Sequence, residues 1–152
     1  MISSKNSVQM EWEGGASPEV PTAPDNLKEA GLSLAFLNEL TLRVLYVKGS
    51  MLGLELARYL CLPFKVVEEA LKFLKDEKCI EVNGGDLIGR VSYRFTLTEL
   101  GRKRANEAMK SCTYVGPAPV PIEDYVEQTY RQAVTGLNCT PEPLRSAFAH
   151  LV

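Results

Sequence analysis

Pro63 is the residue that most constrains the fold, because it separates two stretches whose apolar residues have helical spacing. A proline disfavours helical geometry in the residue before it, whereas its own fixed φ suits the first turn of a helix. The stretch Leu54–Leu60 therefore predicts one short helix, and a second is expected to start at Pro63. The inward face of this second helix is predicted to consist of Val67, Ala70, Leu71 and Leu74.

A longer helical pattern precedes this pair. Its apolar residues recur every three to four positions and are Leu34, Leu37, Leu40, Val44 and Val47. Ser33 can cap the first free amides, and Gly49 can end the helix in the left-handed conformation. The pattern predicts a helix between these two residues, with a short extended piece at Ser50-Met51.

A β-hairpin and a further helix are predicted after the third helix. Residues 80–82 form a short strand pattern, residues 83–86 have turn chemistry, and residues 90–97 alternate with a period of two. The apolar face of the second strand comprises Val91, Tyr93, Phe95 and Leu97, and the other face comprises Arg90, Ser92 and Arg94. Thr96 and Glu99 have the spacing of a capping box, so a helix is expected from about Thr98 to Ser111.

Three helices, a hairpin and a helix are typical of a winged helix-turn-helix domain. The sequence therefore predicts a mainly α fold with a small β-hairpin, followed by C-terminal helices. Composition divides the chain into a flexible leader (1–26), the winged-helix domain (27–112), a proline-rich connector (113–121) and a C-terminal helical segment (122–152). The last helix has no capping residue, so we expect it to lead into a further domain beyond Val152.

Three runs in linear order carry a family resemblance. They are GLELARYLCLPFKVVEEALKFLKDEKCIEVNGGDLIGRVSYRFTLTELGRKRA, YVGPAPVPIEDYVEQTYRQ and TPEPLRSAFAHLV. The region from about residue 24 to residue 152 resembles the N-terminal region of a family of bacterial AAA ATPases. The resemblance implies that a nucleotide-binding domain follows, and that ATP is bound only through that domain.

The charge balance limits the classes of function. The chain has 17 basic and 19 acidic residues, with a formal net charge of −2. A tail-driven DNA binder is excluded, because such proteins depend on a large basic excess. No apolar run approaches the roughly 20 residues that span a bilayer, and Met1–Gly15 lacks the pattern of a signal peptide. We expect a cytoplasmic protein with no membrane partner.

Residues that carry catalysis or bind metals are sparse. The four cysteines have no CxxC spacing and His150 is the single histidine, so no metal site is expected. Cys61 and Cys79 lie in apolar patterns and are expected to behave as small hydrophobes. Lys48-Gly49-Ser50 is interpreted as a helix end, because no Walker A motif is present. We expect neither a cofactor nor enzymatic activity in this chain.

The predicted domain offers two candidate surfaces. Residues 27–112 carry 14 basic and 11 acidic side chains. The candidate nucleic-acid contacts are Lys65, Glu69, Lys72, Arg90 and Arg94. The candidate protein contacts are Phe73, Leu87 and Ile88. Ordinary ion pairs also fit the basic residues, with Lys72 close to Glu68, Glu69 and Asp76 along a helix. Arg90 and Arg94 would then pair with Glu81 across the hairpin.

These observations leave three hypotheses. The first is a non-catalytic module for protein recognition, self-association or regulation of the attached AAA ATPase. In this hypothesis the connector 114–121 transmits the position of the module toward the missing domain. The alternative is a winged-helix DNA-binding transcriptional regulator that dimerises through the helix at 98–111. The third is a small-molecule sensor that uses Tyr125, Tyr130 and Arg131.

Overall fold

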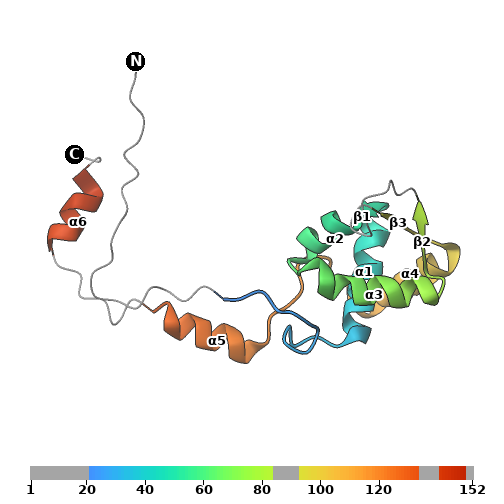
Figure 1. The fold of residues 1–152 in the computed structure, drawn as a ribbon, viewed down its shortest axis with the longest axis horizontal. Coiled ribbons are helices and arrows are strands. Elements are labelled where there is room, and N and C mark those ends of the chain that lie inside the picture. The colour runs from blue at the N-terminus through green and yellow to red at the C-terminus, as the bar shows by residue number, and fades with distance from the viewer. Residues whose placement is uncertain (1–20, 84–92, 134–140, 150–152) are drawn as a thin grey trace, which may run out of the picture. The chain divides into compact units, whose positions relative to one another are not determined.

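The computed structural model describes residues 21–83, 93–133 and 141–149 (Figure 1). Its elements in chain order are α1 (Leu34–Lys48), β1 (Met51–Leu52), α2 (Gly53–Leu60), α3 (Phe64–Asp76), β2 (Ile80–Asn83), β3 (Arg94–Leu97), α4 (Glu99–Ser111), α5 (Ile122–Arg131) and α6 (Pro141–Phe148). Residues 22–122 form one compact unit, which contains α1 to α4 and the three strands. The other unit contains α6 and all but the first residue of α5.

Helix α1 forms the centre of the first unit. The Ser33 hydroxyl accepts a hydrogen bond from the amide of Phe36 at 3.2 Å, and Gly49 ends the helix with φ +77°. Both helix ends are as predicted. α1 packs against α3, α4 and β3, so residues on most of its circumference are buried. Val47 is an exception to the predicted apolar face, because it lies in the last turn and is 55% exposed.

Helices α2 and α3 form the predicted helix-turn-helix. The turn begins at Cys61, which has φ +55°. The amide of Leu62 donates to the carbonyl of Ala57, and the amide of Cys61 donates to Arg58, which is the pattern of a Schellman helix end. Cys61 is exposed, so the expectation that its thiol packs as a small hydrophobe is wrong at this position. Cys79 is buried, as predicted.

Helix α3 begins one residue later than predicted, because Pro63 is the N-cap and not the first helical residue. The carbonyl of Pro63 accepts from the amides of Val66 and Val67. The buried face of α3 contains the four predicted residues and one more: Val66, Val67, Ala70, Leu71 and Leu74. This apolar face fixes α3 on the domain and leaves the opposite face in solvent.

The three strands form one antiparallel sheet in the order β1-β3-β2, and they lie side by side in Figure 1. Phe95 and Leu97 of β3 are buried and Arg94 is exposed, as the alternation predicts. β3 begins at Arg94, whereas the expected positions 90–92 lie outside the described residues. A mainly helical fold with this small sheet confirms the predicted winged helix-turn-helix class.

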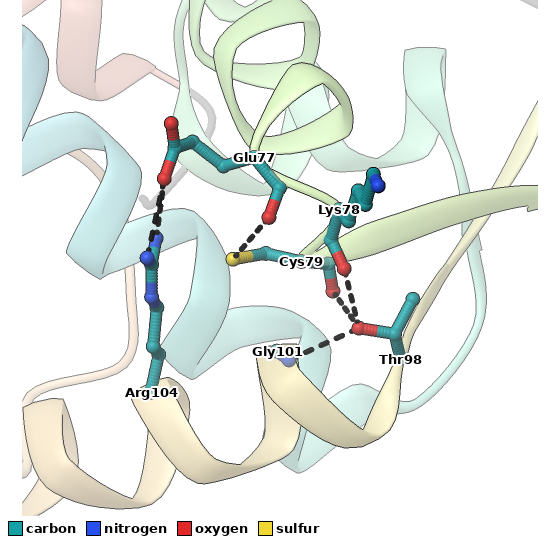
Figure 2. A network of polar contacts seen from close by, with 6 residues as sticks. All are labelled: Glu77, Lys78, Cys79, Thr98, Gly101 and Arg104. Atoms are coloured by element: carbon teal, nitrogen blue, oxygen red, sulfur yellow. Dashed lines mark hydrogen bonds and ion pairs between the residues drawn. The ribbon is translucent and has the colours of Figure 1, made fainter.

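Helix α4 is capped by Thr98 itself, and the predicted capping box between Thr96 and Glu99 is wrong. The Thr98 hydroxyl accepts from the amide of Gly101 at 3.1 Å and donates to the carbonyl of Lys78 at 2.7 Å (Figure 2). The Thr98 amide also donates to the carbonyl of Cys79 at 3.0 Å. These bonds tie the first turn of α4 to the chain that joins α3 to β2.

The proline-rich connector 113–121 belongs to the first unit and is bonded to α2. The amide of Ala118 donates to the carbonyl of Leu60 at 2.8 Å, and Tyr114 donates to the carbonyl of Pro117. Helix α5 follows with acidic residues in its first turn, as predicted, and none of its residues is buried. None of the helices in the described part of the chain is both long and apolar enough to cross a membrane.

Candidate nucleic-acid interface

The outward face of α3 carries three of the predicted nucleic-acid contacts. Lys65, Glu69 and Lys72 follow one another at intervals of four and three residues, so they share one side of the helix. All three are exposed. We call these residues the α3 face. It lies opposite the buried apolar face, so the helix-turn-helix presents it to solvent.

Lys65 forms one ion pair, with Asp25 in the segment before α1. The Nζ–Oδ1 distance is 3.7 Å, and the two side chains are 72% and 80% exposed. Exposed pairs of this kind contribute little to stability, because water and salt screen them. Lys65 is therefore able to exchange Asp25 for another anion at little cost.

Glu69 and Lys72 are not held by other side chains. Within residues 21–83, 93–133 and 141–149, neither side chain forms a hydrogen bond or an ion pair. The expected pair between them is therefore absent, although the spacing of three residues permits it. Both charged groups face solvent.

Arg94 lies at the base of the predicted wing. Its Nη1 donates to the carbonyl oxygen of Ser50 at 3.3 Å and lies 3.5 Å from the Ser50 hydroxyl. The predicted pairing with Glu81 is wrong, because the strand register places Arg94 opposite Asn83 and Glu81 opposite Thr96. Arg94 is exposed, and among the described residues only its Nη1 has a hydrogen-bond partner. Arg90 lies outside the described residues.

The predicted protein contacts are only partly described. Phe73 is 42% exposed and follows Glu69 by four residues, so it lies one helical turn beyond Glu69 at the border of the α3 face. Leu87 and Ile88 lie outside the described residues, so the structure does not place the three residues relative to one another.

The basic run at the start of α4 is divided between two roles. Arg104 donates two hydrogen bonds to a carboxylate oxygen of Glu77, at 3.2 and 3.1 Å (Figure 2). This interaction raises the pKa of the Arg104 guanidinium, with a smaller contribution from Cys79. Arg102 and Lys103 are exposed. Arg104 thus links α4 to the end of α3. The basic run 102–104 therefore does not act as a single anion site.

An apolar stripe runs along α5. Its residues are spaced by three, one and four positions and are 43–78% exposed: Ile122, Tyr125, Val126 and Tyr130. Two of the three residues expected in a small-molecule site, Tyr125 and Tyr130, belong to this stripe. The third, Arg131, bonds to Glu127 one turn earlier. The described part of the chain also contains no group of three or more His, Cys, Asp or Glu residues that could hold a metal ion.

The structural neighbours of this chain differ from the predicted family. No family model and no curated protein matches the chain. A MarR family regulator from Neisseria meningitidis is 19% identical, with 76% of this chain and 70% of that chain covered and a TM-score of 0.43. Staphylococcus aureus MepR, a transcription regulator of the multidrug efflux pump MepA, is 21% identical, with 76% and 73% covered and a TM-score of 0.43.

A third structure, described for the regulation of DNA binding of Bordetella bronchiseptica BpsR by 6-hydroxynicotinic acid, is 20% identical. The match covers 76% of this chain and 74% of the BpsR chain, with a TM-score of 0.43. These neighbours are regulators and not N-terminal regions of AAA ATPases, so the predicted resemblance to AAA ATPases is wrong.

Proposed function

We propose that this chain binds duplex DNA as a winged-helix transcriptional regulator, with α3 in the major groove. This proposal rests on one observation, the exposure of the α3 face. Its three charged side chains are exposed on a helix whose opposite side is buried in the helix-turn-helix. A major groove about 12 Å wide admits one such helix, and N-terminal residues of a recognition helix reach the base edges.

The charge distribution supports binding to DNA, with a limited electrostatic contribution. Residues 27–112 have a basic excess of 3, although the whole chain has a formal net charge of −2. Arg94 at the wing base adds a guanidinium suited to a phosphate oxygen. A few phosphate contacts give a moderate salt dependence, unlike the steep dependence of strongly basic proteins.

Lys72→Glu is expected to weaken DNA binding about tenfold and to lower the slope of log affinity against log salt by about one unit. The reason is that the change removes a phosphate or base contact and adds a repulsive charge. The measurement is a titration of labelled mixed-sequence duplex at several salt concentrations, with the full chain.

Lys110→Glu is the matched control, because it makes the same charge change at an exposed position of α4. We expect the control to lower affinity much less. Equal losses in the two variants would mean that only net charge matters and would contradict a specific role for α3. Absence of binding by the natural protein at low salt would overturn the proposed function.

We also propose that the chain self-associates through α5. The apolar stripe of α5 is exposed, whereas α4, the predicted dimer helix, packs against α1 and exposes mainly charged residues. The polar side of α5 is acidic in the first turn and carries Arg131 in the last. In an antiparallel pair of identical helices, the acidic first turn of one helix would lie beside the Glu127–Arg131 ion pair of the other and the two apolar stripes would cover each other, so a second copy of this chain suits the surface.

The double variant Tyr125→Ser/Tyr130→Ser is expected to weaken self-association by at least about tenfold, because it removes most of the apolar area of the stripe. The measurement is sedimentation over a range of protein concentrations. Gln132→Ser, just beyond α5, is the control and should leave the association unchanged. A natural protein that is monomeric at all concentrations, or a double variant that associates normally, would contradict the α5 interface.

A further inference from the structure

We propose that Glu69 determines the sequence specificity of DNA binding, by accepting a hydrogen bond from the exocyclic amine of a cytosine in the major groove. The ligand would be duplex DNA with a C·G pair opposite Glu69. This inference rests on the proposed function, because it assigns a base to one residue of the same α3 face.

The position of Glu69 suits contact with a base edge. It is the sixth residue of the 13-residue helix α3, within the N-terminal half. It lies between Lys65 and Lys72 along the exposed side of the helix. Val66 and Ala70, on the other side, are fully buried and fix the rotation of the helix about its axis. Glu69 is therefore directed outward together with the two lysines.

Glu69 has no role in holding the fold together. Its carboxylate makes no hydrogen bond and no ion pair in the described part of the chain. Two other carboxylates of the same unit do hold the fold together: Glu55 accepts from the amide of Leu52 at 2.9 Å, and Glu77 accepts from Arg104. The charge of Glu69 is thus free for an intermolecular contact.

A carboxylate is unfavourable on a surface that binds only phosphates. It repels the DNA backbone and so weakens binding to every sequence. The same group becomes useful if it meets a donor on one base, because binding then depends on that base. The placement of a free carboxylate between two lysines therefore indicates base readout, with the lysines supplying attraction to phosphates or guanines.

Cytosine is the base whose edge fits a carboxylate best. A carboxylate only accepts hydrogen bonds, and guanine and thymine present acceptors at the corresponding groove positions. Adenine presents an amine, but its N7 acceptor lies beside it and would repel the second carboxylate oxygen. Cytosine presents an N4 amine whose neighbour on the same ring is a C5–H and not an acceptor. The chemistry of the α3 face therefore selects a C·G pair.

The experiment selects binding sequences from a randomised duplex library with the full chain and with Glu69→Gln, Glu69→Ala and Glu107→Gln. The natural protein should favour cytosine at one position by at least about tenfold. Glu69→Ala should lose this preference and bind mixed-sequence duplex more tightly than the natural protein. Glu69→Gln should shift the preference to adenine, because a glutamine amide pairs with both adenine N6 and N7.

Glu107→Gln is the matched control, because it removes one negative charge at an exposed position of α4. It should keep the natural preference for cytosine. An unchanged binding sequence in both Glu69 variants would overturn this inference and leave the proposed function intact. Failure of the natural protein to bind any duplex would overturn both. Since Glu69 is exposed, circular dichroism of each variant is expected to match the natural protein.

Discussion

Gly101→Ala is expected to lower the free energy of unfolding by about 3 kcal/mol, one of the largest effects of any single substitution in this chain. A Cβ at this position would stand 2.9 Å from the carbonyl carbon of Cys79 and closer still to its oxygen. The obstacle is backbone, which cannot rotate away like a side chain. Thr98 holds the same region in place, since its amide bonds to the Cys79 carbonyl and its hydroxyl caps Gly101.

Chemical denaturation of the two proteins, monitored by circular dichroism, measures this effect. Asn106→Ala introduces the same residue at an exposed position of α4 and should be neutral or slightly stabilising, because alanine has the higher helix propensity. If Gly101→Ala were as stable as Asn106→Ala, the close packing of α4 against Cys79 would be contradicted. If the proposed function holds, a displaced α4 should also weaken DNA binding, which the titration with labelled duplex measures.

Local patterns in the sequence predicted the elements well where the controlling interactions are local. The caps of α1 at Ser33 and Gly49 depend on atoms within one helical turn. The inward face of α3 depends only on the spacing of its apolar residues. The exposed α3 face follows from the same periodicity. For this reason three of the five candidate DNA contacts could be placed on one surface from the sequence.

Interactions between distant segments were not predictable from such patterns. The helix ends at Cys61 and Lys78 both have φ +55°, although neither residue is a glycine that would have signalled a left-handed conformation. The partner of Arg94 depends on the register in which β3 pairs with β1 and β2. Position 101 needs a glycine because the carbonyl of Cys79, 22 positions away in the sequence, leaves no room for a Cβ.

Arg43 is the clearest case of a residue whose environment the sequence conceals. It lies in a run of apolar residues on α1 and is 1% exposed. Its Nη1 donates to the carbonyl of Cys112 at 3.0 Å, at the C-cap of α4. Its Nε has no partner, and no carboxylate in the described part of the chain pairs with the guanidinium. A positive charge at a helix C-terminus is favourable, but burial without a counter-ion is costly.

Arg43→Ala is expected to lower the free energy of unfolding by about 3 kcal/mol, because it leaves a cavity between α1 and α4 and removes the bond to Cys112. Arg43→Met keeps most of the volume and removes the buried charge, so we expect it to be at least as stable as the natural protein. Chemical denaturation of the three proteins tests this order.

A methionine variant as unstable as the alanine variant would show that the guanidinium bond to Cys112, and not the filled volume, joins α4 to α1. The bond to Cys112 is only partly buried and the residue is exposed, so water that reaches the carbonyl can replace the bond when the guanidinium is removed. The volume filled by Arg43 should therefore contribute more to stability than its charge. Since α1 supports both α3 and α4, a cavity at this position should also loosen the helix that presents Lys65, Glu69 and Lys72.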